Sequence, residues 1–325
     1  MAKNSKKALA VLTSGGDAPG MNAVIRAAVR TGIKSGYRMI GIKRGFSGLL
    51  SEDFVTLDTN SVSNIIERGG TILNTARCLE FREEEYQQKA ADICRENGIE
   101  GVIVCGGDGS FRGAKALFEH GVNVTGVPCT IDLDIQCTEY TIGFDTAVNT
   151  AMEAIDKIRD TSASHERCSI IEVMGRSAGY IALWCGIASG AEEVLIPELY
   201  DGNEQNIIDR MTEAKKKGKK HFIIVNAEGV GGSQEMAKRI ENATGIETRA
   251  TILGYMQRGG SPSCRDRVIA TMMGERAAEL LVHGHSNRIV CWRAGRIFDM
   301  SIGEAFATTK AIPDELVRIP VSLKR

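Results

Sequence analysis

Short apolar runs of β-type composition alternate along the chain with longer segments whose apolar residues recur every three or four positions. The runs lie at 8–13, 39–42, 102–105, 122–127, 169–174, 194–196, 222–226 and 251–253. The helical segments lie at 22–35, 83–97, 111–119, 146–161, 204–217, 234–242 and 265–282. This alternation predicts an α/β architecture in which helices cross between the strands of mostly parallel sheets.

Length and charge limit the class of protein. A chain of 325 residues is long enough for two domains of roughly 150 residues each. With 40 Lys and Arg against 41 Asp and Glu, the net charge is -1, so no overall field recruits nucleic acid or an anionic membrane. The nine cysteines contain no CxxC spacing, no secretory start is visible, and the longest apolar run, near 181–188, is too short to cross a bilayer. We expect a cytoplasmic protein without nucleic-acid or membrane partners.

Two glycine-rich loops follow predicted strands, at the sheet edge where α/β proteins bind ligands. Residues 15–20 form a strand-to-helix turn that favours an anion, but Met21 and Asn22 replace the Lys and Ser/Thr of a P-loop. Residues 106–110 miss the dinucleotide pattern because Arg112 stands at the third glycine. Glycines around Asp108 suit a phosphate chain with its Mg²⁺, although a plain turn capped by Asp108 is the alternative.

A third loop carries Asp132 and Asp134 two residues apart. If the segment is extended, both carboxylates point to one side. One could then accept a hydroxyl proton while the other helps to hold a metal ion, as phosphoryl transfer requires. Solvated loop aspartates are the alternative interpretation.

Five motifs in one order carry a family resemblance. They are Leu12–Asn22, Gly106–Ser110, Thr130–Asp132, Met174–Arg176 and Gln257–Gly260, joined by Thr161–His165 and Glu247–Thr251. Together they resemble the bacterial ATP-dependent 6-phosphofructokinases from about Ala8 to Ile302. The resemblance implies two Rossmann-like lobes with the active site in the cleft: a nucleotide lobe of 1–144 plus 256–308 and a sugar-phosphate lobe of 145–255 plus 309–325. It also implies a magnesium-dependent glycolytic kinase that moves the γ-phosphoryl group of ATP to the 1-hydroxyl of fructose 6-phosphate, and an allosteric homotetramer.

The same resemblance assigns roles to individual residues. Asp132 would be the base, with Thr130, Arg77 and Arg176 assisting catalysis, and Asp108 and Asp134 would bind Mg²⁺. The nucleotide would be bound by Gly16, Phe46, Arg77, Cys78, Gly107, Asp108, Gly109 and Ser110. The sugar phosphate would be bound by Thr130, Asp132, Arg167, Met174, Gly175, Arg176, Glu228, Arg249, Tyr255 and Arg258, with two of the arginines reaching in from a neighbouring subunit. Without the motifs, each arginine would be read as an ordinary surface residue and Phe46 as core.

Departures from the family pattern keep two alternatives open. Cys129, Leu133, Tyr255 and Tyr180 replace the usual Gly, Asn, His and Asp. These changes leave room for a catalytically weak regulatory paralogue that binds sugar phosphate. A pyrophosphate-dependent enzyme is the other alternative, but such relatives carry Asp at position 109 and Lys at position 129, where this chain has Gly109 and Cys129. The sequence therefore favours ATP.

An effector site is also implied by the resemblance. Its basic residues match Arg26, Arg30, Arg159, Lys217, Lys219 and Lys220, which predicts binding of small anions such as phosphoenolpyruvate. The segment 59–64 lacks the Arg and Tyr that bind the nucleoside in relatives, so ADP should act weakly. A solvated helix end is the alternative interpretation of the lysines.

Overall fold

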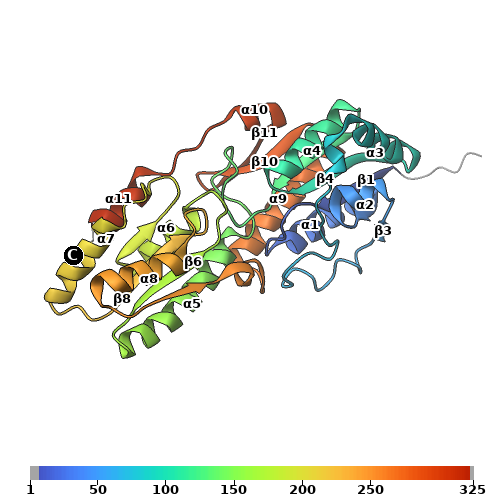
Figure 1. The fold of residues 1–325 in the computed structure, drawn as a ribbon. Helices are drawn as coiled ribbons and strands as arrows, with labels where there is room; N and C mark the ends of the chain where they lie inside the picture. The colour runs from blue at the N-terminus through green and yellow to red at the C-terminus, as the bar shows by residue number, and fades with distance from the viewer. Residues whose placement is uncertain (1–6, 323–325) are drawn as a thin grey trace, which may run out of the picture. The chain divides into compact units, whose positions relative to one another are not determined.

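The computed structural model describes residues 7–322, which divide into two compact units. Unit 1 comprises the residues up to Thr146 together with Arg258–Lys310. Unit 2 comprises Ala147–Gln257 together with the residues from Ala311 onward. Each unit is built around one sheet flanked by helices (Figure 1).

The sheet of unit 1 has seven strands in the order β11-β10-β5-β4-β1-β2-β3. The five inner strands are parallel, while β3 and β11 pair antiparallel at the two edges. The bounds are β1 Ala8–Thr13, β2 Arg38–Ile42, β3 Phe54–Leu57, β4 Ile99–Gly106, β5 Asn123–Pro128, β10 Arg288–Arg293 and β11 Arg296–Ser301.

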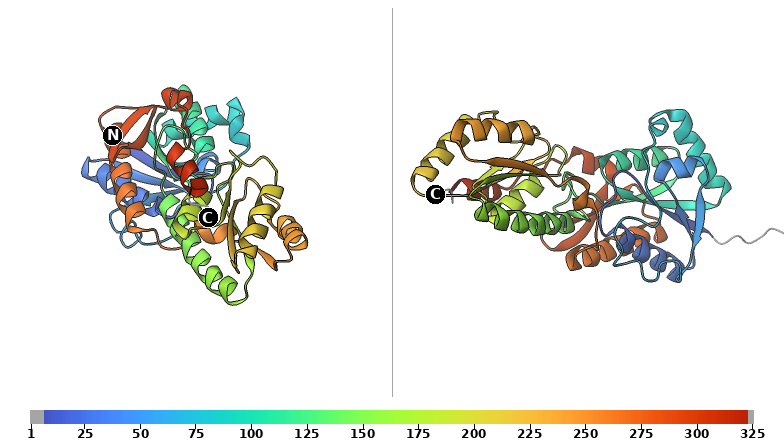
Figure 2. Two further views of the ribbon diagram at one scale, coloured as in Figure 1. Left: turned by 90° about the vertical axis from the view of Figure 1, so that its left-hand side faces the viewer. Right: turned by 60° about the horizontal axis from the view of Figure 1, so that its bottom comes forward.

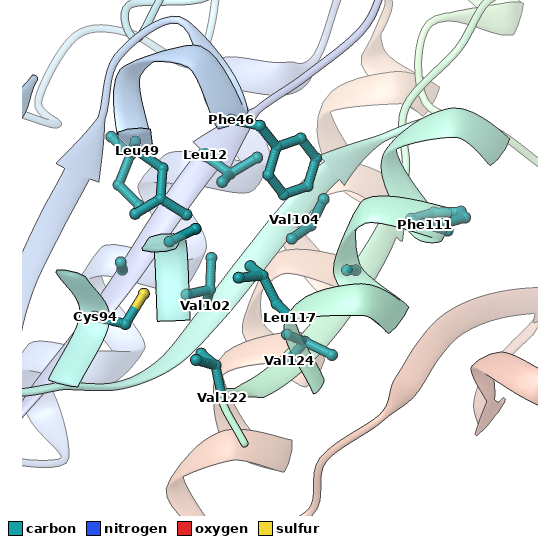
Figure 3. Packing of buried hydrophobic residues seen from close by; sticks show 14 of the residues in the cluster. Leu12, Phe46, Leu49, Cys94, Val102, Val104, Phe111, Leu117, Val122 and Val124 are labelled. Carbon is teal, nitrogen blue, oxygen red and sulfur yellow. The ribbon is translucent and has the colours of Figure 1, made fainter. Parts of the chain in front are cut away.

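Helices cover both faces of this sheet because its inner strands are apolar on both sides. Leu12, Val102 and Val104 face one core, against Phe46, Leu117 and other side chains of α2, α3 and α4 (Figure 3). The opposite face meets α1 and α9, where Thr125 donates to the Ala277 carbonyl at 3.1 Å. The helices are α1 Met21–Lys34, α2 Gly45–Leu50, α3 Glu84–Glu96, α4 Asp108–Glu119, α9 Cys264–Val282 and α10 Ile302–Ala307, with a 3-10 turn at Glu80–Arg82.

Unit 2 holds a four-stranded, entirely parallel sheet in the order β7-β8-β6-β9. Helices α7 and α8 pack their apolar stripes on one face, and in the right-hand view of Figure 2 the orange α8 and the green α5 lie on opposite sides of the strands. The bounds are α5 Phe144–Ser164, β6 Cys168–Val173, α6 Tyr180–Ser189, β7 Glu193–Leu195, α7 Gln205–Lys216, β8 Phe222–Ala227, α8 Ser233–Thr244, β9 Thr248–Ile252, the 3-10 turn Gly254–Arg258 and α11 Asp314–Ser322.

The predicted α/β class with mostly parallel sheets is confirmed, but the sequence pattern does not predict several of the elements. The run near 181–188 is helix α6, which is buried over most of its surface and therefore shows no helical periodicity. The segments β3, β10, β11, α2, α10 and α11 were also not predicted. No helix within residues 7–322 combines the length and apolar composition needed to span a bilayer.

Candidate active site

Three loops of unit 1 meet at the carboxyl ends of β1, β4 and β5. A Cβ atom on Gly106 would lie 2.5 Å from the Ser14 carbonyl and 2.4 Å from Oγ of Ser110, so the first two loops touch through a glycine. The amide of Cys129 donates to the Gly106 carbonyl at 3.0 Å and joins the third loop to the second. The polar segments singled out in the sequence therefore form one continuous edge.

The second loop opens helix α4 at Asp108. Amides of Ser110 and Phe111 donate to the Gly107 carbonyl at 2.9 and 3.1 Å, which closes the first helical turn. A Cβ on Gly109 would meet nothing within 4 Å, so open space lies beside the helix N-terminus. Backbone amides at such a terminus favour an anion, and the open space admits one.

The first loop carries Gly16, which lies against Arg258 of the same unit. A Cβ on Gly16 would come within 2.6 Å of Nη1 of Arg258, and that nitrogen donates to the Asp17 carbonyl at 3.1 Å. Thr75 ties a further segment to this loop by donating to the Gly15 carbonyl at 2.7 Å. That segment carries Arg77, which is exposed, and Cys78, which is half-buried. Burial raises the pKa of the Cys78 thiol.

The third loop is a tight turn, so the condition that would point both carboxylates to one side, an extended segment, is not met. Leu133 has a φ of 55°, in the left-handed region, and Asp132 and Asp134 do not follow the alternation of a strand. Thr130 and Asp132 are buried, and Oγ1 of Thr130 accepts a hydrogen bond from the Asp132 amide at 3.2 Å. Thr130 thus orients the backbone that carries the predicted base.

Phe46 is packed into the core of unit 1. Its ring stacks on Phe81 with centroids 4.3 Å apart, and a Cβ on Gly113 would lie 2.6 Å from it on the α4 side. The side chain is 5% exposed. This geometry favours the core-packing interpretation, and stacking on adenine stays a prediction.

In unit 2, the carboxyl end of β6 leads into the turn Met174–Arg176. The Met174 amide donates to Oε1 of Gln257 at 2.8 Å, and Oε1 of Glu228 accepts from the Gly175 and Arg176 amides at 3.2 and 2.5 Å. Arg176 itself has a φ of 57° and an exposed side chain. Gln257 and Glu228 therefore hold the strained backbone that presents Arg176.

Arg167 and Arg249 lie at the opposite end of the strands of the same sheet, where β6 and β9 begin. Both bind Glu247: Nε of Arg167 donates to Oε2 and Nη2 of Arg249 donates to Oε1, each at 2.7 Å. The hydrogen bond from Arg167 lowers the pKa of Glu247. At ~3.3 Å rise per residue, the strand β6 separates this pair from Met174 by about 20 Å.

The predicted effector lysines are engaged with carboxylates of unit 2. Lys217 binds Glu213 at 2.7 Å, Lys219 binds Glu192 at 2.6 Å and Lys220 binds Glu166 at 2.7 Å. Arg159 donates to the Ser189 carbonyl at 2.5 Å. Arg26 and Arg30 lie on α1 of unit 1.

Comparison with known proteins decides the family. Residues 8 to 281 match the family model described as Phosphofructokinase. The chain belongs to the phosphofructokinase family. Proteins named ATP-dependent 6-phosphofructokinase from Clostridium botulinum are 54% identical over 98% of this chain and 100% of their own length, and one from Clostridium acetobutylicum is 55% identical over the same shares.

Solved structures agree on the fold of this phosphofructokinase family member. Phosphofructokinase from Saccharomyces cerevisiae has a TM-score of 0.86 at 32% identity, and the match covers 98% of this chain but 47% of the yeast chain. The pyrophosphate-dependent phosphofructokinase from Marinobacter aquaeolei has a TM-score of 0.84 at 21% identity over 95% of this chain and 86% of that one. At that identity the second likeness shows the fold alone.

Two carboxylates that the sequence predicts as metal ligands have the chemistry that Mg²⁺ prefers. Asp108 and Asp134 lie half-buried on facing loops, since a Cβ on Gly107 would approach Cδ1 of Ile135 at 4.0 Å. Within residues 7–322 no group of three or more His, Cys, Asp or Glu forms a metal centre. Mg²⁺ commonly takes only one or two carboxylates and completes its shell with substrate phosphates and water, so this oxygen pair fits.

Three of the four departures from the family pattern are buried, and the fourth, Tyr255, is exposed. Cys129 and Tyr180 are buried, and burial raises the pKa of the Cys129 thiol well above its ordinary value. Leu133 is buried although it sits in the left-handed region that Asn adopts more readily. Tyr255 is 83% exposed on the 3-10 turn of residues 254–258.

Proposed function

We propose that this protein transfers the γ-phosphoryl group of ATP to the 1-hydroxyl of fructose 6-phosphate, giving fructose 1,6-bisphosphate. The observation that carries the proposal is the full-length likeness, at 54% identity, to proteins named ATP-dependent 6-phosphofructokinase. The reaction is the committing step of glycolysis, and the enzyme would work in the cytoplasm. Unit 1 would bind the nucleotide and unit 2 the sugar phosphate.

Asp132 is the proposed base. Its carboxylate takes the proton of the 1-hydroxyl as the sugar oxygen bonds to the γ-phosphorus and the bond to the ADP oxygen breaks. A buried carboxylate in a turn oriented by Thr130 suits this role, because a general base must be held within hydrogen-bond reach of the proton. Arg77 and Arg176 would stabilise the charge spread over the transferring group.

Asp108 and Asp134 would hold Mg²⁺, which when bound neutralises charge on the phosphates. Gly16 and the segment Gly107–Ser110 supply backbone amides and room for the nucleotide phosphates. Phe46 and Cys78 complete the proposed nucleotide residues.

Gly109 and Cys129 support ATP over pyrophosphate as the donor. Gly109 leaves space beside the phosphate loop that the α-phosphate and adenosine need. Cys129 is a buried neutral thiol and offers no ammonium to a free pyrophosphate. The pyrophosphate-dependent structural neighbours share only the fold.

The position of Arg167 and Arg249 supports an assembly of at least two subunits, as the proposed homotetramer requires. The proposed sugar-binding residues Met174, Gly175 and Glu228 lie at the carboxyl ends of β6 and β8, and the arginine pair lies at the amino ends of β6 and β9. Because one rigid sheet separates the two sets, a phosphate bound with Glu228 takes these arginines from a second subunit. Arg258 and Tyr255 would complete the sugar-phosphate site. The cationic side chains of Arg26, Arg30, Arg159, Lys217, Lys219 and Lys220 would bind a small anionic effector.

One coupled assay tests the donor and the reaction together. Fructose 6-phosphate is offered with ATP or with pyrophosphate, and production of fructose 1,6-bisphosphate is followed. We expect turnover with ATP, a large loss in Gly109→Asp and little loss in Gly109→Ala, which keeps the space open. Greater activity with pyrophosphate would overturn the donor assignment. Binding of fructose 6-phosphate without turnover would favour the regulatory paralogue.

A further inference from the structure

Lys310 reaches from the segment after α10 to the loop that carries Asp132 and Asp134. Its Nζ donates to the carbonyl oxygens of Leu133 at 2.7 Å, Thr138 at 3.0 Å and Ile135 at 3.2 Å. Its backbone amide donates to Oε1 of Gln136 at 2.7 Å. Lys310 thus makes four hydrogen bonds to the loop, although it lies more than 170 positions later in the sequence.

The number of N–H donors on the Lys310 ammonium equals the number of carbonyl oxygens that it binds. An ammonium group has three N–H donors, and here three carbonyls point at it. The three distances from Nζ to the carbonyl oxygens, 2.7, 3.0 and 3.2 Å, are hydrogen-bond distances, so each N–H of the ammonium has an acceptor. Converging carbonyl dipoles repel one another and are costly to bury without a donor. The loop therefore requires hydrogen-bond donors at this point, and the Lys310 ammonium supplies three of them.

Strand β10 and Lys310 both hold the far end of the loop, and Lys310 also holds the near end. At the far end, Oγ1 of Thr138 accepts from the Trp292 amide at 2.9 Å, and Sγ of Cys137 lies 3.5 Å from Sγ of Cys291, both on β10. At the near end, Lys310 binds Leu133, the residue between the two aspartates, in its left-handed conformation. The ammonium binds the carbonyl of Leu133, and a small shift of this residue's backbone would move both Asp132 and Asp134.

We propose that Lys310 is a positioning residue for phosphoryl transfer: its ammonium serves as a covalently attached monovalent cation that fixes the turn carrying Asp132 and Asp134. This inference rests on the proposed function. A displacement of about 1 Å at a reacting group can lower a rate by roughly 100-fold, so loss of the ammonium acts on kcat. Fructose 6-phosphate contacts in unit 2 are untouched, and KM for the sugar changes little.

The test compares Lys310→Met with Lys310→Ala in the full-length enzyme. We expect kcat to fall by roughly 10- to 100-fold in both, with KM for fructose 6-phosphate within about threefold of wild type. Lys310→Ala leaves space at the carbonyls, so added ammonium chloride should raise its kcat, while tetramethylammonium should not. Lys310→Met fills the space with a methyl group and should not respond to either salt.

Two control variants separate positioning from general destabilisation. Lys115→Met removes a surface lysine of α4, paired with Glu119 at 3.5 Å, and should leave kcat unchanged. Ile40→Val removes one buried methylene group of β2, a strand that does not pair with the strand before the loop, and it provides a comparison at lowered thermal stability. An equal kcat loss in Ile40→Val would show that Lys310 is merely structural and overturn the inference.

The remaining outcomes are also decisive. An active wild type with Lys310→Met retaining kcat within about twofold would overturn the inference and leave the proposed function standing. Failure of ammonium to raise kcat in Lys310→Ala would also count against it. An inactive wild type would overturn the proposed function itself. If Lys310→Met does not fold, Lys310→Gln, which keeps two donors, replaces it and should show an intermediate kcat with unchanged KM.

Discussion

The guanidinium of Arg258 covers Gly16 so closely that a Cβ atom there would lie 2.6 Å from Nη1. The obstructing atoms are the end of a flexible side chain, which can move aside at small cost in stability. The position of the Arg258 guanidinium, which we propose to bind the sugar phosphate, therefore depends on the absence of a side chain at Gly16.

Gly16→Ala should move Arg258 without unfolding unit 1. Losing one charge-assisted hydrogen bond of ~1.5–3 kcal/mol to the sugar phosphate would raise KM for fructose 6-phosphate by roughly 10- to 100-fold. Steady-state kinetics measure the effect, and thermal unfolding should show little change in Tm. Gly303→Ala, where a Cβ meets nothing within 4 Å, is the matched control. A large fall in Tm for Gly16→Ala would mean that Arg258 cannot yield.

Asp132→Asn tests the base. The amide keeps the shape of the carboxylate but cannot accept the hydroxyl proton, so kcat should fall by ~10²–10⁴ while KM for fructose 6-phosphate changes little. Asp92→Asn, an exposed aspartate of α3, serves as the control. Near-wild-type turnover in Asp132→Asn would assign proton removal to another group.

Mixing two inactive variants tests the shared site. Asp132→Ala lacks the proposed base, and Arg249→Ala lacks an arginine that the proposed assembly takes from the neighbouring subunit. After unfolding and refolding of an equal mixture, some sites combine an intact Asp132 with an intact Arg249 from the neighbour. Random assembly gives about a quarter of the wild-type activity. A mixture with no more activity than its components would place both residues in a site within one subunit.

Acid should weaken the β10–β11 hairpin through Asp299. Burial raises the pKa of Asp299, but hydrogen bonds from Arg276 and Arg288 outweigh burial and hold it below the ordinary 3.8. A folded-state pKa below the unfolded one stabilises the protein above pH 3.8, and this stabilisation is lost as the pH falls through the folded-state value. Asp299→Asn should lower the free energy of unfolding at pH 7 by on the order of 1–3 kcal/mol.

Urea unfolding at pH 7 and pH 3 measures this effect. The difference between wild type and Asp299→Asn should shrink at pH 3, and Asp92→Asn should behave like wild type at both. A constant difference would mean that packing, and not ionisation, accounts for the loss.

The predictable part of the fold consists of elements with a clear local pattern. Strands such as β1 and β8 are buried apolar runs between helices, and their bounds follow from composition. The segments β10 and β11 are harder because Arg293 and Arg296 stand at the turn and most of β11 is only half-buried. Helix α6 lacks a polar face, so its period is invisible.

The site was predictable where motifs repeat a family pattern and unpredictable where distant segments meet. The loops around Gly16, Asp108 and Asp132 follow strands that lie side by side, and parallel topology alone brings them together. Nothing near Lys310 marks it in the sequence, because the carbonyls and the side-chain amide oxygen that it binds lie in residues 133–138. The motifs also group Arg249 with the predicted sugar-phosphate residues. They do not show that it lies at the amino ends of the strands, opposite the carboxyl ends that carry Met174 and Glu228.

The strand order of unit 1 has a consequence for synthesis on the ribosome. The four strands of unit 2 lie within residues 168–252 and leave the ribosome before β10, which begins at Arg288. Until then β5 has no neighbour on its outer side, since β10 pairs with it through Arg288 and Ile289. A nascent chain therefore displays an open β-edge for the time needed to translate about half its length, and such an edge is a site at which chains can pair wrongly. Truncations that end before residue 288 would make this transient hazard permanent.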